Sequence, residues 1–211
     1  MVMTKGDGKM RLADCASVRS GLVLARKQAK VPTGNRYSLI NLRSVQQDGS
    51  IDLSEIDVYD AKEPLKGEYL SQEGDVIVRL TAPYTAVLID DTTSNMVVSS
   101  NFVIIRACSR KLVPGYLYWL LNTREMKRRI FENTTSNMLG AVKAKYLAEL
   151  ELPSLPIQEQ IRIAQLHLLA NREGRLLRQL AQEKQKYYAG LLEQAHKKRK
   201  KVGGYDDQKG H

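Results

Sequence analysis

The sequence predicts an α/β (α+β) protein, with one mixed-sheet domain followed by one long C-terminal coiled-coil helix. Two observations predict this fold. Up to residue 152, short apolar runs alternate with Gly, Asp, Asn and Pro, a pattern typical of strands joined by turns. After Pro156, about forty residues follow with no proline and few turn residues. We therefore expect a compact domain over residues 1–155, a long helix over 156–198 and a basic, flexible tail over 199–211.

Several strands and one helix are expected within the compact domain. β-Branched and aromatic residues cluster between turn residues in five stretches, at 37–42, 50–53, 76–80, 85–89 and 97–106. The dipeptide Asp48-Gly49 predicts a tight turn between the first two stretches. Residues 116–131 have the apolar spacing of a helix, and its basic face would contain Arg124, Lys127, Arg128 and Arg129.

The long helix carries an apolar stripe that its own domain is too small to cover. Pro156 suits the first turn of a helix, and about forty residues extend roughly 60 Å at 1.5 Å per residue. Such a helix needs another helix beside it, which predicts a homodimer or a partner subunit. The alternative is a helix folded back on its own domain. The residues expected at the helix interface are Ile161, Leu169, Leu176, Leu180, Tyr187 and Leu191.

The chain is basic, with 33 Lys and Arg against 23 Asp and Glu and a net charge of +10. More than half of this excess lies after residue 155, so the compact domain is mildly basic. A basic protein suits a polyanion, because contacts to phosphates release condensed counterions. Two cysteines without a CxxC motif and three histidines predict no metal site. We find no stretch typical of a signal peptide or membrane span, and therefore expect a cytoplasmic protein without a membrane partner.

The sequence lacks the motifs of DNA-modifying and nucleotide-binding enzymes. It contains no GxGxxG and no GxxxxGK[ST]. Residues 81–84 read Thr-Ala-Pro-Tyr and lack the acidic or amide residue and the second proline of an amino-methyltransferase motif. The histidines lie in the expected helix and tail, so a Ser-His-Asp arrangement is not expected. Asp57, Asp60 and Glu63 could imitate a metal-nuclease centre. The weight of these observations favours a binding protein with no cofactor and no catalytic residue.

Several segments, taken in order, resemble the specificity (S) subunits of type I restriction-modification systems. The sharpest match is the joint, where residues 147–156 are similar to the family's L-x-x-L-x-[IL]-P and residues 156–164 to its P-x-x-E-Q-x-x-I-A. Residues 74–79 are similar to the family's G-D-[IV]-[IL]-x-R strand, although the glycines of the loop that usually follows are missing. Weaker matches cover residues 12–21, 40–51, 99–106 and 114–123.

The resemblance implies a half-length form with one target-recognition domain, because full-length members carry two such domains and two spacer helices. It also implies binding of bipartite sites in double-stranded DNA and recruitment of methyltransferase (M) and restriction (R) subunits, which perform the chemistry. A bacterial or archaeal protein of this kind is expected to form a homodimer through its helix. Its site would then be an interrupted palindrome, since a two-fold symmetric protein requires symmetric half-sites.

Polar residues on loops of the recognition domain are the expected DNA contacts. Arginine can fork onto guanine and asparagine onto adenine, while Ser, Thr, Tyr and Lys more often hold phosphates. The candidates are Arg79, Thr81, Tyr84, Thr135, Ser136, Asn137, Lys143 and Lys145, with Arg43 and Arg36 as lesser ones. A plain turn at residues 134–137 and a salt bridge at Arg79 are the structural alternatives. For the whole chain, a stand-alone dimeric DNA-binding regulator and a small metal-dependent nuclease stay open.

Overall fold

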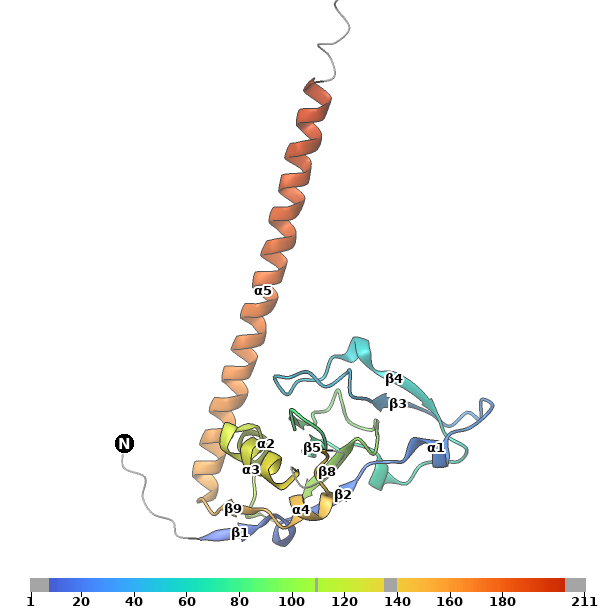
Figure 1. Cartoon of the computed structure of the whole chain (residues 1–211), viewed down its shortest axis with the longest axis vertical. Coiled ribbons are helices and arrows are strands. Elements are labelled where there is room, and N and C mark those ends of the chain that lie inside the picture. The colour runs from blue at the N-terminus through green and yellow to red at the C-terminus, as the bar shows by residue number, and fades with distance from the viewer. Residues whose placement is uncertain (1–7, 109, 135–139, 204–211) are drawn as a thin grey trace, which may run out of the picture. The chain divides into compact units, whose positions relative to one another are not determined.

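The computed structural model describes residues 8–108, 110–134 and 140–203, with side chains as far as Lys197 (Figure 1). The strands are β1 (Lys9–Arg11), β2 (Ala16–Ser20), β3 (Arg36–Ile40), β4 (Asp57–Asp60), β5 (Val76–Arg79), β6 (Ala86–Leu88), β7 (Val97–Val98), β8 (Phe102–Ala107) and β9 (Glu151–Pro153). The helices are α1 (Leu24–Lys27), α2 (Pro114–Asn122), α3 (Arg124–Thr134), α4 (Ala144–Ala148) and α5 (Ile157–Gly203). The predicted fold class, sheets and helices followed by one long helix, is confirmed.

The strands form three sheets. The largest has the order β2-β8-β5-β6 and is antiparallel throughout. A second sheet has the order β4-β3-β7, in which β3 pairs antiparallel with β4 and parallel with β7, so the predicted mixed pairing is present. In the third, β1 pairs with β9, and Met10 lies opposite Leu152. This last pair ties the beginning of the described chain to the segment just before the joint. β1, β2, β4 and β9 are not among the predicted strands.

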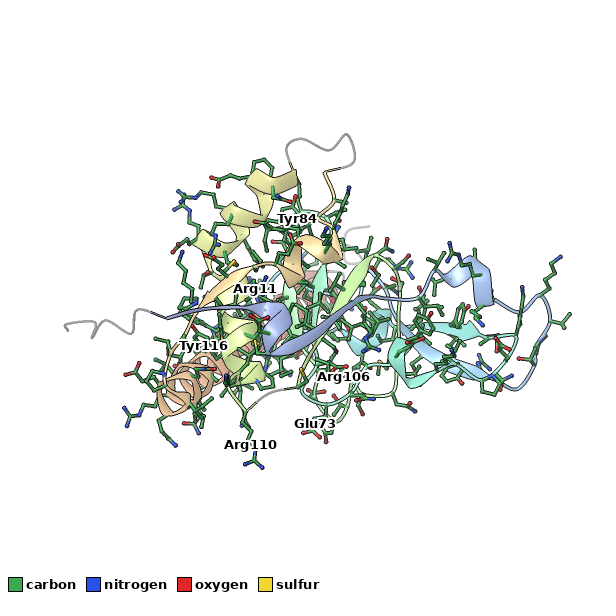
Figure 2. The ribbon with its side chains drawn as sticks, turned by 90° about the horizontal axis from the view of Figure 1, so that it is seen from below. Arg11, Glu73, Tyr84, Arg106, Arg110 and Tyr116 are labelled. Carbon is green, nitrogen blue, oxygen red and sulfur yellow. The ribbon has the colours of Figure 1, made fainter. Side chains whose placement is uncertain are left out.

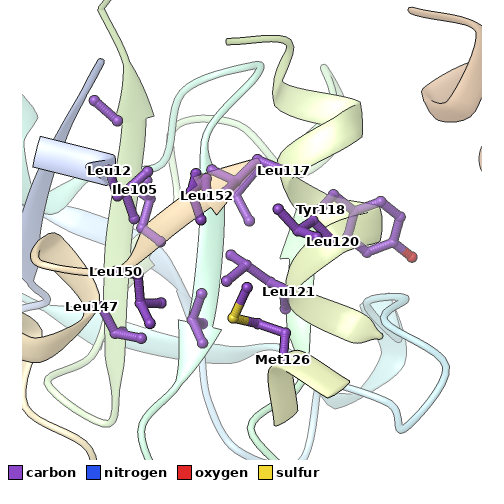
Figure 3. Close-up of a cluster of buried hydrophobic side chains, with 14 of the residues drawn as sticks. Leu12, Ile105, Leu117, Tyr118, Leu120, Leu121, Met126, Leu147, Leu150 and Leu152 are labelled. Carbon is purple, nitrogen blue, oxygen red and sulfur yellow. The ribbon is translucent and has the colours of Figure 1, made fainter. Parts of the chain in front are cut away.

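The core lies on both faces of the largest sheet. Successive side chains of a strand point to opposite faces, and β5 supplies both: Val76 and Val78 enter one hydrophobic cluster while Ile77 enters another. Helix α2 covers the first face, where its Leu117 and Leu121 pack near the strands (Figure 3). Because both faces are covered, β5 consists of apolar residues in a row and lacks the alternation of apolar and polar residues that is typical of a half-exposed strand.

Three expected elements differ in the structure. The stretch expected over residues 97–106 is two strands, β7 in the sheet β4-β3-β7 and β8 in the largest sheet. Residues 50–53 form no strand; Ile51 makes an isolated bridge, and the Asp52 side chain accepts a hydrogen bond from the backbone N–H of Ser54 to start a short 3-10 turn. The expected helix over 116–131 is two helices, broken at Thr123, whose backbone is extended. The Thr123 hydroxyl accepts from the backbone N–H of Met126, at 3.3 Å, and so caps the start of α3.

A buried ion pair fixes the beginning of β5. The Asp75 carboxylate is 1% exposed and receives two hydrogen bonds of 2.7 Å from Arg106, at the end of β8. It also accepts from the backbone N–H of Gln72. Hydrogen bonding to this carboxylate raises the pKa of Arg106 above its ordinary value. The two strands are therefore held in register by a charge pair that water hardly reaches.

The joint between domain and helix is locked by one buried amide. Gln160, in the first turn of α5, has no exposed surface. Its side-chain oxygen accepts from the backbone N–H of Val113, and its nitrogen donates to the carbonyls of Lys111 and Leu155, all at 2.9 Å. Two turns later, the His167 ring lies 5.0 Å from the Tyr118 ring of α2, and burial lowers the His167 pKa. These contacts attach the first turns of α5 to the domain.

The chain forms two compact units, residues 1–167 and 168–211, so the first turns of α5 belong with the domain. The helix is continuous to Gly203, five residues beyond the expected end, and residues 199–203 of the expected flexible tail are therefore helical. Residues 204–211 lie outside the described part of the chain. None of the helices in the described part could cross a membrane.

We expect Gln160→Leu to lower the free energy of unfolding by about 3 kcal/mol or more. Leucine fills the space but leaves one N–H and two carbonyls without partners, and each unsatisfied buried group costs about 1–3 kcal/mol. Urea unfolding measures the loss. Gln158→Leu, at an exposed position two residues earlier in the same helix, is the control and should change stability by less than about 0.5 kcal/mol. Equal effects of the two substitutions would contradict the locking role of Gln160.

Candidate nucleic-acid interface

The loop that follows β5 presents two of the candidate residues. Arg79 ends the strand and is half-buried, and its Nε donates to the hydroxyl of Thr81 at 3.2 Å. The backbone N–H of Arg79 donates to the carbonyl of Thr85, which closes the loop. Arg79 has no salt bridge within the described residues, so its guanidinium keeps donors for a ligand. Thr81 is partly exposed beside it.

Tyr84 joins this loop to the second candidate segment. Its side chain is 4% exposed, and its hydroxyl donates to the carbonyl of Gly140 at 3.0 Å and lies 2.9 Å from the Thr134 hydroxyl (Figure 2). The backbone N–H of Val142 donates to the carbonyl of Leu80 at 2.8 Å. The structure thus brings residues 79–85 against both flanks of residues 135–139. Because its hydroxyl is used inside the protein, Tyr84 supports the loop and is not placed to touch DNA.

We call residues 79–85 and 140–143 together the loop cluster. Lys143 is exposed at its edge, and Lys145, on the first turn of α4, lies 3.9 Å from Glu149. Thr135, Ser136 and Asn137, which the sequence places between the two parts of the cluster, lie outside the described residues. The cluster therefore combines a half-buried arginine, a hydroxyl and an exposed lysine from segments that are about 60 residues apart in the chain.

The two lesser candidates belong to a different sheet. Arg43, just after β3, pairs with Asp57 at 2.8 Å and with Glu55 at 3.8 Å. Arg36 begins β3, is exposed, and lies opposite Asp60 in the register. These arginines are part of the β4-β3-β7 sheet, so the predicted contacts divide between two places.

The expected basic face of α3 is partly used within the protein. Arg128 pairs with Glu132, and Arg129 donates to the carbonyl of Glu151. Lys127 is half-buried, and this burial lowers its pKa. Arg124 is exposed. Helix α3 therefore offers fewer free cations than its sequence suggests.

A second group of cations was not predicted, apart from Arg36. It comprises Arg26, Lys27, Lys30, Lys62 and Lys66, from two segments that hydrogen bonds bring together. Charge counted segment by segment would have pointed to residues 24–37, which hold four basic residues and no acidic one.

Two of the three acidic residues considered for metal binding are used by neighbouring groups. Asp57 receives hydrogen bonds from Arg43 and Asn41, and Glu63 pairs with Lys27. Within the described residues, no group of three or more His, Cys, Asp or Glu is arranged to hold a metal ion. Of the two thiols, Cys15 is buried, which raises its pKa, and Cys108 is exposed.

Most residues expected at the helix interface are exposed. Leu169, Leu176, Leu180, Tyr187 and Leu191 lie on the second unit and are between 43% and 63% exposed. Ile161 differs, since it is half-buried on the first turns of α5 that belong with the domain. The apolar stripe beyond His167 thus has no cover among the described residues.

Comparisons with known proteins find similarity of fold. No protein-family profile and no curated protein matches the chain. The HsdS subunit from Thermoanaerobacter tengcongensis is similar over 89% of this chain, with a TM-score of 0.57 and 20% identity, and 48% of that chain is covered. A chain of a type I R-M system, solved in work on complex assembly and conformational transition, is similar over 97% of this chain, with a TM-score of 0.62 and 17% identity. Here 50% of that chain is covered. The chain has the fold of these structures and spans about half of their length.

We expect Arg79→Ala to relax sequence preference at one base pair and to weaken specific binding by about 1–3 kcal/mol, because a forked arginine discriminates guanine by that amount. Lys143→Ala should weaken binding to every sequence and lower the salt slope by about 0.9. Binding to duplexes with each base pair changed in turn, at several salt concentrations, measures both. Lys9→Ala, which removes an exposed cation of β1 that pairs with Glu151, is the control. If Arg79→Ala weakens binding to every duplex sequence by the same factor, Arg79 does not read a base.

Proposed function

We propose that this chain is the DNA-recognition component of a type I restriction-modification complex. It selects the DNA sequence and recruits M subunits, with R subunits where the system has them, and it performs no chemistry itself. The observation that carries this proposal is the fold shared with half of an HsdS subunit. The resemblance of residues 147–164 to the joint of specificity subunits supports it independently. In this proposal residues 1–155 read DNA and residues 156–198 pair with a second copy.

An eleven-residue repeat along α5 supports pairing with another helix. Three series of apolar residues recur at this interval: Leu166, Leu177 and Tyr188; Leu169, Leu180 and Leu191; Ala170, Ala181 and Leu192. Eleven residues correspond to three turns of about 3.67 residues each, so the series stay in contact when two helices coil with a right-handed twist. The leucines and tyrosines in these series are between 43% and 72% exposed. A partner helix with the same repeat would cover all of them.

Two charged residues within the apolar face favour one arrangement of a homodimer. At about 100° per residue, Glu173 and Lys184 fall between the Leu166 and Leu169 series. A parallel pair would place each charge against its own copy, and like charges repel. An antiparallel pair centred between residues 178 and 179 places Glu173 against the partner's Lys184. The same register sets Leu176 against the partner's Ala181, so a large side chain meets a small one.

The antiparallel arrangement has a consequence for the DNA site. Counting from Ile157 to the centre of the pair and out again gives about 65 Å between the two joints at 1.5 Å per residue. Two identical domains related by a two-fold axis read identical half-sites in opposite orientation. With base pairs stacked about 3.4 Å apart, the centres of the half-sites should fall within one to two duplex turns. The proposed target is therefore an interrupted palindrome.

Charge reversal tests the register. Glu173→Lys and Lys184→Glu should each weaken the dimer by about tenfold or more, or about 1.4 kcal/mol, because each puts two like-charged pairs into the interface. The double variant should restore wild-type affinity. Sedimentation at a series of concentrations measures dimerisation, and Leu180→Asp should abolish it by burying a carboxylate. In a parallel dimer both single variants would match the wild type, since every pair is already of like charge, and this result would refute the antiparallel register.

Selection from random duplexes, with capture of partners, tests the function. The purified chain should enrich an interrupted palindrome, and it should retain an M subunit encoded in the same genome. Leu180→Asp is the matched variant and should lose preference for the paired half-sites. Enrichment of DNA without any M subunit would favour a stand-alone regulator, and metal-dependent cleavage by the chain alone would favour a nuclease. Failure to enrich any sequence would overturn the proposal.

A further inference from the structure

The α1 lobe, which we define as residues 24–37 and 58–66, brings two basic segments together. The backbone N–H of Ala29 donates to the carbonyl of Asp60, and that of Lys62 donates to the carbonyl of Lys27, at 2.9 and 2.8 Å. On the other side, β3 pairs with β4. Figure 1 shows α1, β3 and β4 together at one end of the domain. Residues about thirty positions apart in sequence therefore share one surface.

The charge of this lobe accounts for the whole net charge of the domain. It holds six basic and two acidic residues, a net charge of +4, while residues 1–155 hold 21 basic and 17 acidic residues, also +4. Lys27 pairs with Glu63. The other cations make no ion pair with any residue that the structure describes; they are Arg26, Lys30, Arg36, Lys62 and Lys66. Arg26, Lys30, Lys62 and Lys66 are exposed, as is Arg36.

Two tyrosines hold the basic segments without using their charges. Tyr59, which is 3% exposed, donates its hydroxyl hydrogen to the carbonyl of Leu24 at 2.8 Å. Burial raises the Tyr59 pKa, which keeps this hydroxyl protonated as a donor. The Tyr37 hydroxyl accepts from the backbone N–H of Leu65 at 3.1 Å. Beneath them, Leu39 and Val97 belong to a separate hydrophobic cluster. The backbone that carries the cations is thus anchored, and the cations remain available to a ligand.

We propose that the α1 lobe binds the sugar–phosphate backbone of duplex DNA, while the loop cluster reads bases. The inference rests on the proposed function. The cations are spread along two segments, residues 26–36 and 62–66, so they match a row of phosphates better than one small anion. Duplex DNA presents a charge about every 1.7 Å along its axis. Lysine and arginine on such a surface add affinity without sequence preference.

Neutralising the lobe tests this assignment. The variant carries Arg26→Gln, Lys30→Gln, Lys62→Gln and Lys66→Gln, and it leaves the Lys27–Glu63 pair and Arg36 in place. Four lost phosphate contacts should make the plot of log affinity against log salt shallower by about 3.6. Between 50 and 200 mM salt the wild type should then lose about a hundredfold more affinity than the variant. The preference for the selected site over altered sites should persist.

A control variant removes four exposed cations elsewhere, with the same change in net charge: Lys9→Gln, Arg11→Gln, Arg110→Gln and Arg162→Gln. It should keep nearly the wild-type salt slope, and equal urea midpoints should show that both variants are folded. Equal slopes for the two variants would overturn the proposal, as would a lobe variant that loses M-subunit capture but keeps its DNA affinity. The slope is also measured on random duplex, so it reports on the lobe even if the chain proves to have no sequence preference.

Discussion

The side chain of Gln160 is the contact on which the arrangement of the molecule depends. It satisfies main-chain groups of Lys111 and Val113, between β8 and α2, and of Leu155 in the joint, and it is fully buried. A buried amide with one acceptor and two donors has few acceptable orientations, so the first turn of the helix is fixed in rotation as well as in position. The eleven-residue repeat begins at Leu166, six residues later and 71% exposed. The first member of the repeat, Leu166, therefore lies on the exposed side of these first turns.

The parts of the fold that were predictable from sequence are those in which neighbouring residues determine the secondary structure. Val76 to Val78 form an unbroken β-branched run, and the segment after Pro156 contains no proline, while the helix continues through Gly174 and Gly190. Two of the strands that escaped prediction, β1 and β9, have three residues each and pair with one another from distant parts of the chain, as Met10 does with Leu152. The break at Thr123 escaped for a related reason. Threonine is tolerated within a helix, and only its hydrogen bond to Met126 makes it a cap.

The candidate site divides in the same way. Sequence reasoning placed Arg79 and Thr81 on a loop and residues 135–137 ahead of the joint, but the hydroxyl of Tyr84 is what links the two segments. Tyr84 was predicted to contact DNA because a tyrosine hydroxyl can bind phosphate. Its burial depends on tertiary packing, which the sequence alone does not show. The α1 lobe was missed because its cations come from two segments, each of which reads as a loop. Their meeting depends on the tethers of Tyr37 and Tyr59.

If the α1 lobe binds DNA as proposed, a net charge of +4 concentrated in one lobe would separate two tasks that DNA-binding proteins often combine. Phosphate contacts supply affinity for any sequence, and base contacts supply the difference between sequences. If the same side chains performed both tasks, a change of target would also change the strength of binding. The loop cluster contributes one half-buried arginine and few other charges. The cations of the lobe lie on segments whose backbone is hydrogen-bonded to Tyr37 and Tyr59 and packs on an apolar cluster. In this proposal, a change of residues in the loop cluster would alter the target without altering the phosphate contacts of the lobe.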